Sequence, residues 1–178
     1  MSKVIYFEDK NFDLCHDKTY FDFLDYAFSK TNAFMLVYVN YYGKGYTKKQ
    51  KYFKNVLKRF QIKSRTNPSW PGTLSTFSAN TTYKIVFYRT DLEAKKILKK
   101  ESSLNGWSRG NAEDLAFFKN EKCWFYSVGH EKIAAIIHAD TEDFEFLEEY
   151  GLADRNKAFV PEDDYFLQYD ESDLSLLM

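Results

Sequence analysis

The stretch AFMLVYV at positions 33–39 restricts the fold of this chain more than any other segment. It is an unbroken apolar run, and Asn32 and Asn40 bound it. A strand with one wet face alternates apolar and polar residues, whereas a continuous apolar run of this length is typical of a strand buried on both faces. We therefore expect a central strand of a sheet that is covered on both sides.

Strand and helix patterns alternate along the rest of the chain. Apolar runs bounded by turn residues predict further strands at 3–7, 83–88, 114–118, 123–128 and 133–138. Apolar residues at helical spacing predict helices at 19–29, 47–60, 92–100 and 141–150, with Asp91 as an N-cap and Gly151 as a C-terminal stop. We predict an α+β fold, with a single mixed sheet and packed helices in a two- or three-layer sandwich.

Length and composition predict one domain over residues 1–178. The chain is long enough to bury a core without disulfides, and its 44% apolar and 19% aromatic residues are too many for a disordered chain. Seven Gly and three Pro leave little material for linkers or for a glycine-rich phosphate cradle. From about residue 161 we expect an irregular acidic tail.

The N-terminal sequence MSKVIYFEDKNFDL lacks the pattern of a secretory signal, and no apolar run is long enough to span a membrane. We therefore expect a cytoplasmic protein without a membrane partner. Cys15 and Cys123 belong to no CxxC motif, so two free thiols are expected. A disulfide between them is the alternative.

Charge is strongly polarised along the chain. Between Asp25 and Asp91 there is no carboxylate side chain but there are twelve Lys or Arg, whereas thirteen Asp or Glu from Asp140 onward face only Arg155 and Lys157. Fields of opposite sign steer encounter and set specificity, so this pattern concerns partners more than fold. The basic half is expected to meet something acidic, either another molecule or its own C-terminal third.

Catalytic motifs mostly fail. The run beginning His130-Glu131 has Ala134 where a zinc protease needs its second His, and FYSVG has Phe where a nucleophile elbow needs Gly. A pair of His130 and Glu131 acting on Ser127 is the catalytic alternative, because His exchanges protons near neutral pH. The sequence leaves an enzymatic role open but favours a non-catalytic protein.

No metal or other cofactor is expected. His130 and His138 could share one side of a strand, with Cys123 or Asp140 completing a site. A structural metal needs three or four converging ligands, and this spacing does not ensure them.

The basic segment at 44–65 has three interpretations. Its cations interleave with Tyr46, Tyr52, Phe53 and Phe60, a mixture that single-stranded nucleic-acid binding uses. An amphipathic helix with a solvated Lys face produces the same pattern. The third interpretation is an acidic protein partner, which the predominance of Lys over Arg favours over nucleic acid.

Three tracts resemble a known family. They are SRTNPSWPGT (64–73), TTYKIVFYRTDLEAKKIL (81–98) and EDLAFFKNEKCWFYSVGHEKIAAII (113–137). Over roughly residues 20–155 the chain is similar to small bacterial proteins, mainly from Firmicutes, that often carry the label stage III sporulation protein AH. The resemblance implies no catalytic residues. In size and composition the chain also resembles immunity proteins that accompany polymorphic toxins.

These observations together predict a non-catalytic cytoplasmic interaction protein. Its concrete form would be an immunity-type protein that neutralises a toxin domain by occlusion, and its partner an acidic protein surface. The alternative is a nucleic-acid-associated protein or small hydrolase that uses the basic 44–65 surface. The candidate partner-binding residues are Lys48, Lys51, Lys58, Arg65, Trp70 and Trp107.

Overall fold

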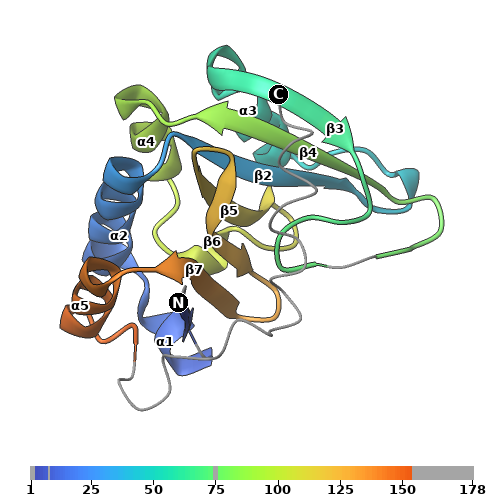
Figure 1. The fold of residues 1–178 in the computed structure, drawn as a ribbon. Helices are drawn as coiled ribbons and strands as arrows, with labels where there is room; N and C mark the ends of the chain where they lie inside the picture. Colours follow the sequence, from blue (N-terminus) through green and yellow to red (C-terminus); the bar gives the residue numbers. More distant parts are fainter. Residues whose placement is uncertain (1–2, 8, 74–75, 154–178) are drawn as a thin grey trace.

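The computed structural model of the protein describes residues 3–7, 9–73 and 76–153. They form a seven-stranded sheet with the order β1-β7-β6-β5-β2-β4-β3 (Figure 1). The strands are β1 (Lys3–Phe7), β2 (Ala33–Asn40), β3 (Gln61–Thr66), β4 (Thr82–Arg89), β5 (Glu113–Lys119), β6 (Lys122–Val128) and β7 (Ile133–Ala139). The α-helices are α1 (Asp9–Leu14), α2 (Asp17–Lys30), α3 (Lys48–Val56), α4 (Leu92–Leu98) and α5 (Thr141–Glu149). Short 3-10 turns lie at η1 (Tyr41–Gly43), η2 (Lys58–Phe60) and η3 (Leu104–Gly106).

The α+β prediction is confirmed, but the sheet of the described chain is antiparallel at every strand pair rather than mixed. The connections explain this difference. Parallel neighbours need a long crossover, whereas β5, β6 and β7 follow one another through tight turns and therefore reverse direction. The connection through α4 joins β4 to β5, which are not neighbours but lie on opposite sides of β2.

The strand β2 lies in the interior of the sheet and is buried on both faces, as its apolar sequence predicted. It pairs with β4 on one side and with β5 on the other. Its residues alternate between two apolar clusters: Phe34, Leu36 and Tyr38 belong to one, and Met35 and Val37 to the other. Because successive side chains of a strand point to opposite faces, both faces of the sheet are buried at this position.

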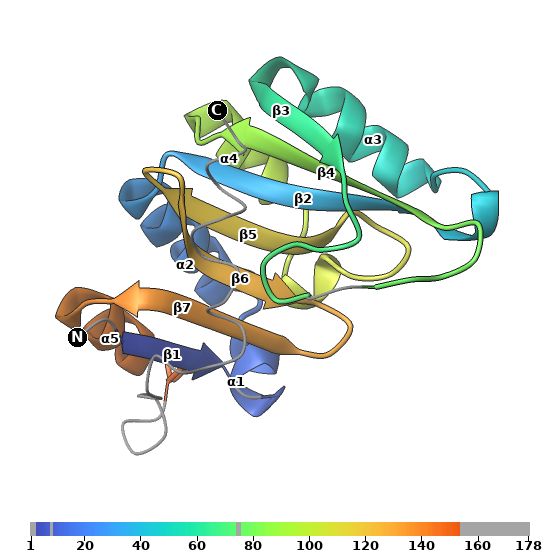
Figure 2. The ribbon, with the colours of Figure 1, turned by 45° about the vertical axis from the view of Figure 1, so that its right-hand side comes forward.

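All five helices contribute to the cluster on the face of Phe34. Figure 2 shows α2, α3 and α4 behind the sheet. The helix α2 packs across the centre, where the rings of Phe23 and Phe125 lie 4.8 Å apart and those of Phe7 and Phe23 lie 6.1 Å apart. Aromatic rings packed edge to face in this way add to the stabilisation that comes from area burial.

Part of the opposite face is covered by residues 67–73, the first half of the long loop between β3 and β4. The ring of Trp70 lies 5.4 Å from that of Tyr83 on β4. Gly72 has a φ of +87° and approaches the sheet so closely that a Cβ atom there would lie 2.6 Å from the Tyr126 ring. Any side chain at this position would therefore clash, which explains the glycine.

The elements expected at 19–29, 47–60, 92–100 and 141–150 are present with small shifts at their ends. The helix α1 and the strand β3 were missed: α1 is a single short segment, and β3 is an edge strand with little apolar periodicity. The acidic tail predicted from about residue 161 lies outside the described residues. Cys15 and Cys123 are buried and form no disulfide with each other, as expected. Among the helices described, none combines the length and the apolarity that crossing a bilayer requires.

Candidate functional site

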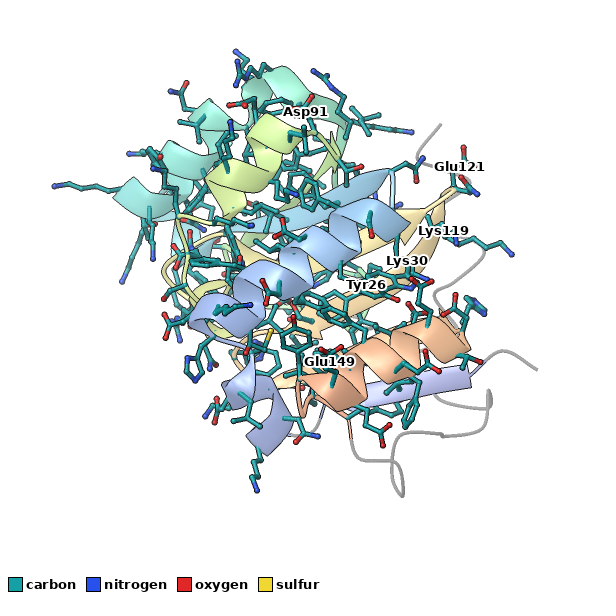
Figure 3. All side chains as sticks on the ribbon, turned by 90° about the vertical axis from the view of Figure 1, so that its left-hand side faces the viewer. Tyr26, Lys30, Asp91, Lys119, Glu121 and Glu149 are labelled. Atoms are coloured by element: carbon teal, nitrogen blue, oxygen red, sulfur yellow. The ribbon has the colours of Figure 1, made fainter. Side chains whose placement is uncertain are left out.

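The charge imbalance of the sequence becomes a separation in space. The helix α3 lies with β3 and β4 at one end of the sheet, and the acidic helix α5 lies near β7 at the other (Figure 1). The first turn of α5 pairs with α2, because Lys30 Nζ lies 3.2 Å from Asp140 and 2.6 Å from Glu142. Figure 3 shows Lys30 directed towards α5. Within the described residues, the lysines of α3 therefore do not pair with the acidic helix.

Beside α3 lies a basic groove with a volume of about 470 Å³. We use the term basic groove for the space lined by Tyr46, Lys51, Lys54, Asn55, Lys58, Gln61 and Lys84. Its four lysines make no ion pair with a carboxylate within the described part of the chain. Four ammonium groups around one concavity make it a site for an anionic group.

The start of α3 is held firmly, which positions the groove. Thr47 and Gln50 form a capping box, in which the Thr47 hydroxyl accepts from the Gln50 backbone N–H and the Gln50 side chain accepts from the Thr47 backbone N–H. Gln50 is buried, and its amide donates to the carbonyl of Val39 at the end of β2 at 3.0 Å. The apolar residue Phe53 then turns towards the core. One side of α3 is thus held against β2, and the lysines of α3 lie on its other side.

The charged form of Lys54 is disfavoured within the basic groove. Burial and the nearby charge of Lys84 lower the pKa of Lys54. The Lys54 ammonium lies 4.5 Å from the centre of the Tyr46 ring, where a cation–π contact compensates part of the repulsion. Lys54 and Lys84 come from a helix and a strand and stay close without a counter-ion in the described residues. An acidic ligand would relieve this repulsion.

The charged candidate partner-binding residues lie in three different places. Lys51 and Lys58 line the basic groove, as predicted. Lys48 lines a different hollow, of about 500 Å³, together with Lys49 and Glu101, which pair at 2.6 Å. Arg65 is half-buried on β3.

The structure contradicts the prediction that Trp70 and Trp107 bind a partner, because both side chains are buried. Trp107 is fully buried and donates from its indole N–H to the Tyr20 hydroxyl at 2.8 Å. Trp70 is 4% exposed and donates to the carboxylate of Asp114 at 2.8 Å. Both indoles fill the core, because a large apolar ring is stabilised there once its single polar group has a partner.

Lys54 and Lys84 were not among the candidate residues. The helical period placed Lys54 beside the other lysines, so its membership could have been inferred from the sequence. Lys84 lies in β4 between two buried residues, and only the packing of α3 against β4 brings it to the basic groove. No pattern in the sequence signals that contact.

The catalytic alternative does not assemble. Ser127 is fully buried in β6, and its hydroxyl donates to the carbonyl of Leu115 at 2.8 Å. His130 Nε2 and Glu131 Oε1 lie 3.6 Å apart on the surface. A nucleophile whose hydroxyl is buried and bonded to the backbone cannot reach a substrate, so the structure gives no support to a hydrolase that uses these residues.

The metal set of His130, His138 and Cys123 or Asp140 does not assemble either. His130 precedes β7 and His138 lies near its far end. At about 3.3 Å per residue a strand holds two such side chains more than ~20 Å apart. His138, Cys123 and Asp140 do line a common hollow with three lysines, at the end of the β5–β6 hairpin. In the described chain this set is not among the groups with converging ligand atoms.

Two neighbouring carboxylates at the start of β5, Glu113 and Asp114, were also overlooked. They are 4% and 1% exposed. Burial raises the pKa of Glu113 to about 7 and that of Asp114 to about 6. Hydrogen bonds from Tyr41 to Glu113 and from Trp70 to Asp114 partly oppose these shifts. Buried acids with raised pKa values often mark functional sites.

No protein-family model, curated protein or solved structure gives a significant match to this chain. Fold and site therefore define the molecule only as an α+β protein with one basic groove. The resemblance of three tracts to the Firmicute family stays a prediction.

Proposed function

We propose that this protein is a non-catalytic binding protein of the cytoplasm whose basic groove receives an acidic surface of another protein. The convergence of Lys51, Lys54, Lys58 and Lys84 without a carboxylate partner in the described residues supports this proposal. Its concrete form is an immunity-type protein that occludes a toxin domain. That finer role rests on the resemblance in size and composition to immunity proteins.

The aromatic residues of the basic segment favour a protein partner over nucleic acid. Stacking of bases needs exposed rings beside the cations. Phe53 and Phe60 are 1% and 3% exposed, and Tyr46 lies beneath the ammonium of Lys54. The exposed ring of Tyr52 lines the other hollow, beside Lys48. The ring of Tyr46 lines the basic groove, but Lys54 already covers one face of it, and the groove offers lysines without the arginine forks that grip phosphate.

The mechanism is steric occlusion assisted by electrostatic steering. An acidic patch is drawn to the basic end of the sheet, while the acidic helix α5 lies at the far end and repels it. Charges at the rim of an interface act mainly on the rate of association. Binding should therefore be fast at low salt and weaken as salt increases.

The test compares two charge-matched double variants. Lys51→Glu/Lys58→Glu reverses two exposed lysines of the basic groove, and Lys119→Glu/Lys122→Glu makes the same change in net charge at the tip of the β5–β6 hairpin. Each protein is used to capture partners from a lysate of its host, and the captured protein is then titrated by surface plasmon resonance. We expect the groove variant to lose at least ~10-fold in affinity, equivalent to about 1.4 kcal/mol, and the hairpin variant to bind normally.

Equal binding by both variants would refute the role of the basic groove. Titration with a single-stranded RNA oligonucleotide distinguishes the alternative function. If RNA binds with a steep salt dependence and the groove variant loses it, the protein is nucleic-acid-associated and the proposal fails. Far-UV circular dichroism checks that both variants are folded.

A further inference from the structure

A cluster of potential metal ligands is formed by Glu113, Asp114 and His130. None of these residues lines the basic groove. Glu113 and Asp114 begin β5, and His130 lies in the turn between β6 and β7. Because β5 and β6 run antiparallel, the start of one lies beside the end of the other. One oxygen of each carboxylate and one ring nitrogen of His130 all lie within 4.8 Å of one another.

The donors around the two carboxylates are neutral. The Tyr41 hydroxyl donates to Glu113 at 2.8 Å. The indole of Trp70 and the backbone N–H of Gly129 donate to the two oxygens of Asp114 at 2.8 and 3.0 Å. These bonds orient the carboxylates but bring no positive charge.

The two buried carboxylates have no Lys or Arg ion-pair partner in the described chain. The charge of Arg109 lowers the pKa of Glu113 in part, but its guanidinium lies over the Tyr41 ring at 4.7 Å and forms no ion pair with either carboxylate. Adjacent carboxylates in a low-dielectric site repel each other, and buried charges in proteins are normally paired with a cation or coordinate a metal. The missing positive charge is an observation independent of the convergence of the ligand atoms, and it points to a bound cation.

We propose that Glu113, Asp114 and His130 bind one divalent first-row transition-metal ion, Zn²⁺ or Mn²⁺. Two carboxylates with one imidazole suit these ions, whereas Ca²⁺ and Mg²⁺ prefer oxygen ligands alone. The imidazole also distinguishes this set from a simple cluster of acids. The side chain of His130 is 56% exposed, so solvent reaches the ion and completes its coordination.

Binding of the ion requires the ligand atoms to move closer together. Tetrahedral bonds of about 2.0–2.2 Å place ligand atoms ~3.3–3.6 Å apart, whereas the atoms of this set lie within 4.8 Å of one another. His130 can supply that movement because it lies in an exposed turn, whereas Asp114 is held by Trp70 and Gly129. Tyr41, Trp70 and Gly129 act as the outer shell that orients the carboxylates. The bound ion joins the start of β5 to the β6–β7 turn.

The sequence led us to expect no metal, because the ligands considered were two histidines with Cys123 or Asp140, which are spread from β6 to the start of α5. The site proposed here shares only His130 with that set. It is also independent of the basic groove, so its test and the test of the proposed function can fail separately.

Isothermal titration of the chelator-treated full-length protein with ZnCl₂, MnCl₂ and CaCl₂ tests the proposal. We expect one Zn²⁺ per chain, weaker binding of Mn²⁺ and no binding of Ca²⁺, following the usual order of affinities. His130→Ala should reduce the affinity for Zn²⁺ by at least the ~10- to 100-fold that loss of an outer-shell partner causes. His130→Asp, which restores a ligand atom, should recover part of it.

His16→Ala and His138→Ala are the matched controls, because both histidines are exposed and lie outside the set. Zn²⁺ should raise the melting temperature of the wild type and of both controls but not that of His130→Ala. All variants are compared first in chelator, where equal melting temperatures show that the fold is intact. Absence of Zn²⁺ binding, or binding that His130→Ala leaves unchanged, would overturn the proposal.

Discussion

Replacement of Asp143 by Ala should lower the free energy of unfolding by about 2–4 kcal/mol, because this carboxylate joins α5 to the rest of the fold. Asp143 is 1% exposed. It accepts from the Tyr26 hydroxyl at 2.7 Å, from the indole N–H of Trp124 at 3.3 Å and from the backbone N–H of Asp140 at 3.0 Å. Lys30 Nζ lies 3.7 Å away (Figure 3 shows Tyr26 and Lys30).

The magnitude follows from the donors that the substitution leaves without an acceptor. A buried donor without a partner costs about 1–3 kcal/mol. The indole N–H of Trp124, which is 5% exposed, would account for most of this cost in free energy. The hydroxyl of Tyr26 is half-buried and can donate to water instead. Loss of the capping box between Asp140 and Asp143 adds about 1 kcal/mol. Lys30 keeps Asp140 and Glu142, so its charge remains paired.

Urea denaturation monitored by tryptophan fluorescence measures the effect, since Trp124 lies at the site. Glu142→Ala is the matched control. Its carboxylate also pairs with Lys30, but its side chain is 70% exposed, so we expect a loss below about 1 kcal/mol. Asp143→Asn should fall between the two, because its amide oxygen can still accept from Tyr26 while its NH₂ group faces other donors. If Asp143→Ala costs no more than Glu142→Ala, the hydrogen-bond hub does not anchor α5 and the reasoning is refuted.

Two further predictions concern packing. Gly129→Ala should destabilise the protein by more than about 3 kcal/mol in the same urea assay. A Cβ atom at this position would lie 2.1 Å from the carbonyl oxygen of Trp107, a backbone atom that cannot rotate away. A loss below about 1 kcal/mol would show that the turn moves freely. The thiols of Cys15 and Cys123 should react with a disulfide reagent such as DTNB only after unfolding. Both side chains are buried, and burial raises the pKa of the Cys15 thiol. Rapid modification of the native protein would contradict this prediction.

Local patterns in the sequence determined most of the secondary structure. The apolar run of β2, the helical period around Phe53 and the cap at Asp91 each act within a few residues, so they could be recognised without knowing the fold. The same argument located the exposed lysines Lys51 and Lys58. Edge strand β3 and the short helix α1 carry weak local signals and were missed.

Strand order and the convergence of distant residues depended on the tertiary structure. Lys84 joins the lysines of α3 only because α3 packs beside β4, and Glu113 meets His130 only because β5 and β6 pair in one register. The burial of Trp70 and Trp107 likewise depends on partners that lie 44 and 87 positions away in the chain. Such contacts are set by the joint burial of apolar surface from the whole chain, which no short stretch of sequence encodes by itself.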